Sequence, residues 1–509
     1  MNTQQQDDGH IIMFPYLAQG HITGFLALAK FISQRKPNIK ITFVSTPLNI
    51  RRLQSALTSG TTIHNNICLA ELPFSSADHG LPPNSENTDS LPPKFILKLL
   101  YASETLKPSF DNLITEIITN EKRVPNCIIA DGIFGWVHDT AKRVGTLHFA
   151  FIPGAYGTAM IYSVTLYLPH RKNDGSSDLI EEFHVPNFPD SYRLRISQLP
   201  VLMRADTKES PPVKFFQKQI SLTLGSDGML CDSVEEIEVL GLETLRKLME
   251  SKPVWTIGPL LPSFLLQGNK KNVSVVSHSR TGKEFGISPE SCIEWLNHQK
   301  PSSVLYISFG SESAISAPNM MELALGLEKS GKSFIWVLRP PSEFDSKSEF
   351  KSEWLPEGFV ERMNESKKGL LVKQWAPQLE ILSHQSTGAF LSHCGWNSTL
   401  ESLSQGVPII GWPLGAEQAF NSLMMEEEMG VCVGLANGSE AEVSSEHVQK
   451  VIEQVMDGSK GEEMRKKATV IAEKICDAMR EDEGGHQKGS SVRSVDDFLA
   501  SVTSKKVVV

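Results

Sequence analysis

Short apolar runs alternate with amphipathic stretches along the first third of the chain. The apolar runs have the length expected of buried strands, and the amphipathic stretches repeat with a helical period. One stretch, for example, places Phe25, Leu28 and Ile32 on a single helical face. Because strands and helices alternate, we predict a parallel sheet with helices on both faces. The predicted strands are 10–14, 39–44 and 126–130, and the predicted helices are 20–33 and 134–144.

A second series of strands begins after a poorly patterned connector at 258–286. We therefore predict an α/β protein with two doubly wound parallel-sheet (Rossmann-like) domains that face each other across a cleft. The expected domains are 1–257 and 258–486, with an end segment of about 487–509, helical over 491–502, packing back on the first domain. Ligands of such sheets bind outside the carboxyl ends of the strands, so the cleft is the expected site. The predicted strands of the second domain are 304–309, 334–338, 370–372, 389–391, 409–411 and 431–433, and the predicted long loops of the first are 81–93 and 171–189.

One uncharged stretch, 149–169, is long enough to cross a bilayer. Pro153, Gly154 and Gly157 interrupt it, however, and hydroxyl-bearing side chains lower its hydropathy. We interpret it as a buried strand, a turn and a packed helix, and expect no membrane span.

The net charge of the chain is −10 and its sequence pI is about 5.8. A nucleic-acid-binding protein usually presents a basic face, so we expect no nucleic-acid partner, and any bound phosphate must be held locally by helix ends and a few donors. The seven cysteines are scattered without a C-x-x-C pair, and the first ten residues lack the apolar core of a signal peptide. We expect reduced thiols, a cytoplasmic location and a monomer.

The sequence contains no convincing motif for binding ATP, NAD or a metal ion. Residues 326–333, GLEKSGKS, match the phosphate-binding pattern of ATPases, but a helix precedes the loop and a strand follows it, which is the reverse of the required order. Gly331 is better explained as a helix C-cap. No two glycines are separated by one residue, and Asp-x-Asp and H-E-x-x-H are absent from the sequence. We therefore expect neither an NAD site nor a metal site.

The segment 375–418 contains the strongest candidate for a ligand-binding site. A strand is predicted to end at His393, followed by a turn and by a helix that opens at Asn397 and Ser398. Gly395 lets a ligand approach the backbone closely, and a helix N-terminus at the end of a strand offers free N–H groups and a positive dipole. A diphosphate could bind there without a metal.

Structural roles explain the same residues when each is taken alone. Ser398 and Glu401 have the spacing of a capping box, in which Glu401 only secures the start of the helix. Trp375 could equally be a core residue. The joint arrangement of these residues is what favours a binding site.

The whole segment resembles the signature box of plant family 1 UDP-glycosyltransferases. Weaker resemblance covers most of the chain, including residues 20–21, 72–74, 80–82, Asp131 and 308–311. It implies the GT-B arrangement, UDP-sugar as co-substrate, and no cofactor. It also implies site roles: Trp375 stacks on uracil and Ala376 and Gln378 bind its edge; Ser311, His393, Asn397 and Ser398 hold the phosphates beside Gly395; Glu401 binds the ribose; Glu417 and Gln418 bind the sugar.

The chain departs from the family pattern at two positions. Glu417 stands where the family usually has aspartate, which lengthens the reach by one methylene, and Gly24 stands where it commonly has proline. The family's combination of Trp at position 396 with a closing Gln418 goes with UDP-glucose more often than with other UDP-sugars. The resemblance therefore implies glucose as the transferred sugar.

His21 and Asp131 are the candidate catalytic residues. Both follow predicted strands of the first domain, so both are expected at the cleft. A histidine titrates near neutrality and can accept a proton from a hydroxyl, and an aspartate can hold its tautomer and stabilise its positive charge. The resemblance supports both roles.

The expected reaction is inverting, metal-independent transfer of glucose to a hydroxyl of a small lipophilic acceptor, such as a phenolic, flavonoid, terpenoid or hormone. Two other functions remain open: a nucleotide-sugar epimerase or hydrolase on the same architecture, and a UDP-sugar sensor without activity. Four aromatic residues are candidates for an apolar acceptor slot, although core packing explains them equally well. They are Phe134, Trp136, Phe151 and Tyr156.

Overall fold

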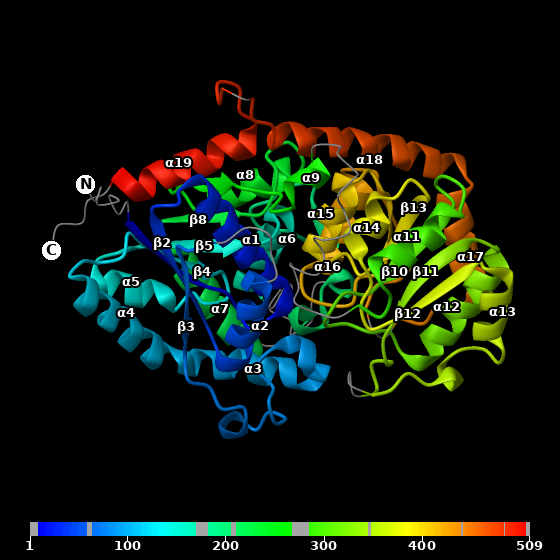
Figure 1. Cartoon of the computed structure of the whole chain (residues 1–509), viewed down its shortest axis with the longest axis horizontal. Coiled ribbons are helices and arrows are strands. Elements are labelled where there is room, and N and C mark those ends of the chain that lie inside the picture. The colour runs from blue at the N-terminus through cyan, green and yellow to red at the C-terminus, as the bar shows by residue number, and fades with distance from the viewer. Residues whose placement is uncertain are drawn as a thin grey trace.

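The computed structural model describes residues 9–58, 64–168, 182–204, 210–266, 285–344, 348–438, 441–482 and 484–504. The first of its two large sheets has seven parallel strands in the order β3-β2-β1-β4-β5-β8-β9. The central strands are buried throughout because helices cover both faces of the sheet (Figure 1). The strands are β1 Gly9–Phe14, β2 Ile39–Ser45, β3 Ile67–Glu71, β4 Cys127–Asp131, β5 Leu147–Ile152, β8 Gly228–Cys231 and β9 Val254–Thr256.

Two hydrophobic cores lie on the two faces of this sheet. One is formed with α1 and α2, and the other with α3, α4 and α5. A separate antiparallel pair, β6 Glu182–His184 with β7 Arg193–Arg195, lies within the segment between α6 and α7. The helices of this half are α1 Gln19–Arg35, α2 Pro47–Thr58, α3 Ile96–Ser103, α4 Lys107–Glu121, α5 Val137–Val144, α6 Ala155–Leu166, α7 Pro211–Leu224, α8 Val239–Leu248 and α9 Ser263–Leu266.

The second large sheet has six parallel strands in the order β12-β11-β10-β13-β14-β15. Its central strands β10 and β13 are again wholly buried. The prediction of two doubly wound parallel-sheet units is confirmed. The strands are β10 Val304–Ser308, β11 Ser333–Leu338, β12 Gly369–Lys373, β13 Thr387–Ser392, β14 Ile409–Gly411 and β15 Cys432–Gly434.

Helices cover both faces of this sheet as well. Helix α12 ends at Gly331, which has φ of 62° and lies before β11, so the GLEKSGKS stretch is a helix end, as expected from its order. The helices of this half are α11 Pro289–Asn297, α12 Ala317–Ser330, α13 Phe359–Ser366, α14 Gln378–Ser383, α15 Trp396–Ser404, α16 Gln418–Glu427, α17 Ser445–Met456 and α18 Ser459–Ala478.

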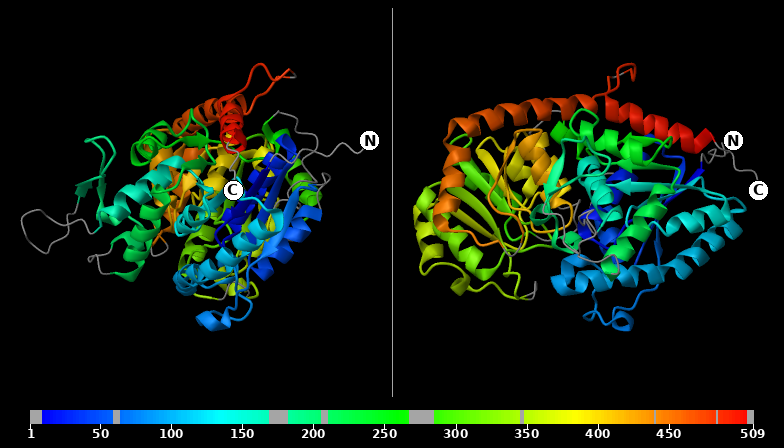
Figure 2. Two further views of the ribbon diagram at one scale, coloured as in Figure 1. Left: turned by 90° about the vertical axis from the view of Figure 1, so that its left-hand side faces the viewer. Right: turned by 180° about the vertical axis from the view of Figure 1, so that it is seen from behind.

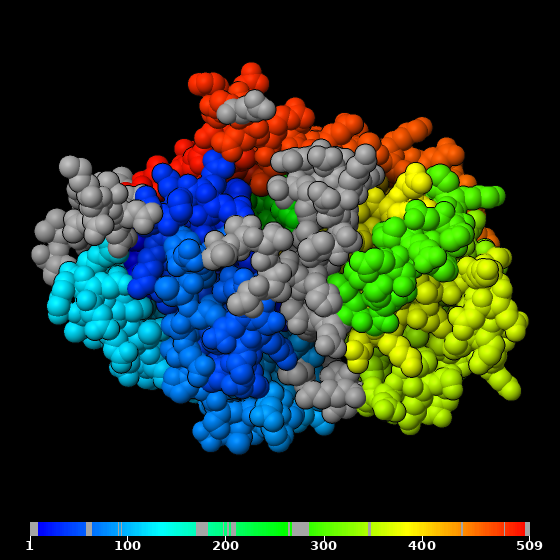
Figure 3. Space-filling model, in the orientation of Figure 1, coloured from blue at the N-terminus to red at the C-terminus, as the bar shows by residue number. Residues whose placement is uncertain are grey.

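The end of the chain connects the two halves. Helix α18 packs on the second half, and α19 Ser490–Ser504 continues along the same edge of the molecule to the first half (Figures 1 and 2). There Phe498 packs edge-on against Phe149 and Trp255, with ring centroids 5.2 and 5.4 Å away. Figure 3 shows this orange and red segment above both the blue and the yellow-green halves.

Each sheet has a switch point where the strand order reverses, between β1 and β4 in the first and between β10 and β13 in the second. Ligands bind in the crevice outside the carboxyl ends of strands at such points. Asp131 is the last residue of β4, and the segments that follow β1, β10 and β13 carry His21, Ser311 and His393 respectively. The topology therefore brings the predicted site residues to the ends of the two sheets.

A few elements differ from the sequence prediction. The predicted loop 171–189 contains the short strand β6 and no strand or helix over 185–189, whereas 171–181 lies outside the described residues, as does 267–284 of the connector. The uncharged stretch 149–169 contains the end of β5 and the buried helix α6. None of the described helices is both long and apolar enough to cross a bilayer.

Candidate functional site

A cavity of about 300 Å³ lies between the two sheets and is lined by residues of both halves. This volume is at the lower end of the range for small-molecule sites. All the predicted donor residues line it, together with His21 and Asp131. Five carboxylates contribute to its wall, whereas no lysine or arginine occurs among the described residues that line it. An anionic ligand must therefore be held here mainly by N–H and hydroxyl groups.

His21 and Asp131 form a hydrogen-bonded pair at the wall of this cavity. His21 lies in the first turn of α1, and its Nδ1 donates to Asp131 Oδ2 over 2.6 Å. Asp131 ends β4, is 4% exposed, and also accepts the backbone N–H groups of Tyr16 and Ile133. Because the carboxylate is fixed by three donors, it holds the imidazole in one orientation and leaves Nε2 as the nitrogen that can take a proton.

The electrostatic surroundings of His21 favour its charged form. Burial opposes the charge, but the adjacent Asp131 and, at longer range, Glu312 and Glu417 outweigh it and raise the pKa of His21 to about 9. The ring of Tyr16 packs edge-on against the imidazole of His21, with ring centroids 5.4 Å apart. The imidazole is thus a stronger base than a free histidine, and a smaller fraction of it is neutral at pH 7.

The N-terminus of α15 forms the opposite wall of the cavity. The helix starts at Trp396 with Gly395 as its N-cap, one residue earlier than predicted, and directly after the turn at His393 and Cys394. A Cβ on Gly310 or on Gly395 would lie 2.6 or 2.5 Å from His393 Nε2, so glycine is required at both positions for the ring to fit between them. Burial, reinforced by Arg339, lowers the pKa of His393 to about 4, so its ring is neutral at pH 7 and can donate one N–H.

Two residues at the start of α15 are already engaged with the first half of the molecule. Asn397 Nδ2 donates to the carbonyl of Gly20 over 3.1 Å, and Trp396 Nε1 donates to the carbonyl of Asp232 over 2.7 Å. The indole of Trp396 is 2% exposed and packs against Gly154, where a Cβ would lie 2.8 Å from the ring. Both residues therefore join the two halves as well as lining the cavity.

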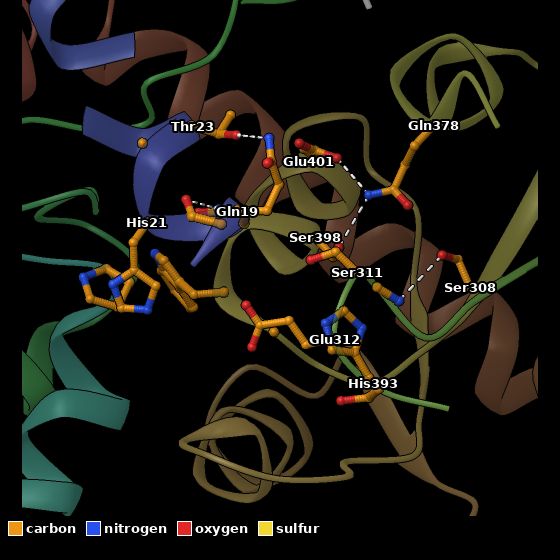
Figure 4. Close-up of a pocket in the computed structure, with 18 of the residues that line it drawn as sticks. Gln19, His21, Thr23, Ser308, Ser311, Glu312, Gln378, His393, Ser398 and Glu401 are labelled. Atoms are coloured by element: carbon orange, nitrogen blue, oxygen red, sulfur yellow. Dashed lines mark hydrogen bonds between the residues drawn. The ribbon is translucent and has the colours of Figure 1, made fainter. Parts of the chain in front are cut away.

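Gln378, Ser398 and Glu401 form one hydrogen-bonded cluster (Figure 4). Gln378 Nε2 donates to Ser398 Oγ over 3.1 Å and to Glu401 Oε2 over 2.6 Å. The capping-box interpretation of Ser398 and Glu401 is wrong, because Gly395 is the N-cap and Glu401 turns towards Gln378. Trp375 is half-buried at the cavity wall and is not a core residue, and Ala376 follows it just before α14.

Glu417 and Gln418 lie at the start of α16. Gln418 Oε1 accepts the N–H groups of Leu414 and Gly415, both over 2.9 Å, so its NH₂ group remains as a donor for a ligand. Burial raises the pKa of Glu417. A Cβ on Gly157 of α6 would lie 3.0 Å from Glu417 Cγ, so this glycine is what lets the two halves approach at this point.

Three of the four predicted acceptor residues lie elsewhere. Phe151 lines the cavity, but Phe134 and Trp136 are packed in the core with Phe14, at centroid distances of 4.7 and 5.9 Å. Tyr156 is fully buried in another core. The prediction that Phe134, Trp136 and Tyr156 line a slot in this cavity is therefore wrong, because these rings fill the interior behind the site.

The sequence interpretation missed Glu312, which lines the cavity directly after Ser311. Its position just beyond a predicted parallel strand is a signal that could have identified it. Its contact with the first half of the molecule, through Thr88, could not have been found from the sequence pattern.

Comparison with known proteins identifies the class. A family model described as "UDP-glucoronosyl and UDP-glucosyl transferase" matches residues 273–470, and one described as "Glycosyltransferase, N-terminal domain" matches residues 7–262. The chain is 43% identical to crocetin glucosyltransferase 3 of Crocus sativus, over 89% of this chain and 91% of that one. It is 40% identical to UDP-glycosyltransferase 92A1 of Arabidopsis thaliana, over 98% of both chains.

Solved structures agree with this assignment. The structure of UGT71G1 from Medicago truncatula complexed with UDP-glucose matches with a TM-score of 0.76 at 26% identity, covering 99% of this chain and 100% of that one. The fold is therefore the GT-B fold, as predicted. The chain belongs to the plant family 1 UDP-glycosyltransferases. It is thus an enzyme that transfers a sugar from a UDP-sugar to a small-molecule acceptor.

Proposed function

We propose that this enzyme transfers glucose from UDP-glucose to a hydroxyl group of a small lipophilic acceptor, with inversion and without a metal ion. The observation that carries the proposal is the 2.6 Å hydrogen bond between His21 and Asp131 at a cavity whose opposite wall is the N-terminus of α15. A base thus faces a site suited to a leaving diphosphate.

In the proposed reaction, His21 Nε2 accepts the proton of the acceptor hydroxyl while the oxygen attacks the anomeric carbon. The bond between that carbon and the diphosphate oxygen breaks, and the electron pair leaves with UDP. Asp131 stabilises the imidazolium that forms. A single displacement converts an α-linked donor into a β-linked product.

The proposed donor pose follows the charges of the cavity. The diphosphate lies at the first turn of α15, where Ser311, neutral His393, Asn397 and Ser398 supply donors and the helix dipole supplies positive potential. The uridine lies between Trp375 and the cluster of Gln378 with Glu401. The sugar lies between Glu417, Gln418 and His21.

Two observations support glucose as the sugar. Gln418 keeps an NH₂ donor available while its Oε1 is fixed by two backbone N–H groups. In addition, a relative of 43% identity is named a glucosyltransferase, and UGT71G1 was solved with UDP-glucose.

The test is turnover of labelled UDP-glucose against a panel of phenolics, flavonoids, terpenoids and hormones, read by mass spectrometry. We expect a β-glucoside product by NMR and activity that persists in excess EDTA. His21→Ala should reduce turnover by about a hundredfold or more while UDP binding, measured by calorimetry, is retained. Near-wild-type turnover by His21→Ala on a phenol would disprove the assignment of the base, and conversion of the donor without an acceptor would indicate an epimerase or hydrolase.

A further inference from the structure

Glu312 occupies the seam between the two halves of the molecule. It lies in the turn after β10 in the second half, yet its Oε1 accepts the hydroxyl of Thr88, from a loop of the first half, over 2.5 Å. The side chain is half-buried and lines the cavity. Figure 4 shows its carboxylate on the side of the cavity that faces His21.

One oxygen of this carboxylate is available to a ligand. Oε1 is held by Thr88, whereas Oε2 makes no hydrogen bond within the described part of the chain. By contrast, Asp131 is paired with His21, and Glu401 accepts from Gln378. Glu312 is thus anchored in position and still has an acceptor site that can face a bound molecule.

Glu312 and the proposed base His21 line the same cavity. Glu312 is close enough to His21 to contribute to its raised pKa. The hydroxyl of Tyr16, a residue that is 4% exposed, has no partner among the described residues, and both Asp131 and Glu312 add to the effect of burial in raising its pKa. An acceptor whose hydroxyl meets His21 therefore lies in a cavity whose wall carries the Glu312 carboxylate on the side that faces His21.

His21 is paired with Asp131, and the cavity offers no other positively charged side chain among the described residues to neutralise Glu312. No lysine or arginine lines it among the described residues. Arg339 lies behind the wall, where its Nη1 donates to the carbonyl of Gly310 over 3.0 Å. A hydrogen-bond donor on the acceptor would satisfy Glu312, whereas a second carboxylate would be repelled by it.

We propose that Glu312 selects acceptors that carry a second hydrogen-bond donor, a hydroxyl or an amine, next to the hydroxyl that is glucosylated. It disfavours acceptors with a carboxylate at that position. This assignment rests on the proposed function, because it requires the acceptor hydroxyl to lie at His21.

Three small phenols test the assignment: catechol, its methyl ether guaiacol, and salicylate. They share the ring and the reacting hydroxyl and differ only in the neighbouring group. The kcat/KM values are measured for the wild type, for Glu312→Gln and for Glu365→Gln, a control on an exposed carboxylate of α13. The readout is the ratio between two acceptors on one enzyme preparation, so partial loss of folded protein cancels.

We expect Glu312→Gln to lower the ratio of catechol to guaiacol about tenfold or more, because a hydrogen bond to a charged group is replaced by one to a neutral amide. In the same variant the kcat/KM for salicylate should rise relative to that for catechol. Glu365→Gln should change neither ratio. Equal ratios in the wild type and Glu312→Gln, or no turnover of catechol, would overturn the assignment of Glu312. Calorimetry with UDP separates the two proposals, since failure of the wild type to bind UDP would refute the proposed function itself.

Discussion

Asn397 and Gly20 join the N-terminal ends of two helices that belong to different halves of the molecule. Asn397 Nδ2 in the first turn of α15 donates to the carbonyl of Gly20, in the first turn of α1, over 3.1 Å. His21 is the next residue along α1, so the base and the proposed diphosphate site are linked by this one hydrogen bond. The distance between His21 and the proposed diphosphate site therefore depends on the orientation of the Asn397 side-chain amide.

Asn397→Asp tests this link. The substitution keeps the size of the side chain, removes its N–H donor and adds a negative charge beside the proposed diphosphate site. We expect the affinity for UDP to fall about tenfold to a hundredfold, measured by calorimetry. Asn364→Asp, at an exposed position of α13, is the matched control and should bind UDP like the wild type. Unchanged affinity in Asn397→Asp would argue against the diphosphate site.

The pH dependence of catalysis follows from the pKa of His21, which is raised to about 9. The base must be neutral to accept a proton, so kcat/KM should rise about tenfold per pH unit below pH 9 and then level off. Asp131→Asn removes the principal attraction for the imidazolium, so the rising limb should move to lower pH, towards the ordinary value of 6.5. The plateau should nevertheless fall at least about a hundredfold, because the imidazolium is no longer stabilised.

A control separates this effect from a general loss of negative charge. Asp139→Asn alters a carboxylate of the same half that is 57% exposed and pairs with Lys107. Its pH profile should coincide with that of the wild type. If kcat/KM of Asp131→Asn still rose up to about pH 9, as in the wild type, the role given to Asp131 would be contradicted.

Gly154 is a sensitive position in the contact between the two halves. A Cβ there would lie 2.8 Å from Trp396 Cδ2 in a closely packed core. Gly154→Ala should therefore destabilise the protein by about 1–3 kcal/mol, seen as a lower midpoint of thermal unfolding, and should raise the KM for UDP-glucose. Gly434→Ala, where the nearest atom to a Cβ is a carboxylate oxygen of Glu426 at 3.4 Å and which does not line the cavity, is the matched control and should leave both quantities unchanged.

The aromatic residues near the site should separate into two classes when they are truncated. Phe151 lines the cavity, so Phe151→Ala should change the relative kcat/KM values of small and large acceptors. Phe134 is fully buried behind Tyr16, so Phe134→Ala should cost about 3–5 kcal/mol of stability and leave the order of acceptors unchanged. A change in acceptor order caused by Phe134→Ala would place that ring in the acceptor site after all.

The sequence pattern predicted the architecture because buried parallel strands are short continuous apolar runs, which are recognised by their length and by the amphipathic helices between them. The pairing of His21 with Asp131 could also be predicted, since His21 follows β1 and Asp131 ends the neighbouring parallel strand β4. The acceptor-binding residues could not be predicted in this way, because an aromatic residue in a core and one at a cavity wall have the same local sequence pattern. Trp136 and Phe151 differ only in what lies beside them, and that depends on packing between distant segments.

The contacts across the seam were equally hidden from the sequence. Thr88 and Glu312 are 224 positions apart, and nothing in either local pattern indicates that they meet. The same holds for Trp396 and Asp232, 164 positions apart. These contacts depend on how the two sheets are packed against each other.

Helix α19 has a mechanical consequence for the enzyme. Helix α18 packs on the second half, and the helix that follows it, α19, packs on the first half through Phe498, which contacts Phe149 and Trp255. The last two helices therefore fasten the two halves to each other along one edge of the molecule (Figure 1). Because this connection restrains one edge, we expect the two halves to separate more easily at the opposite edge when substrate enters and product leaves.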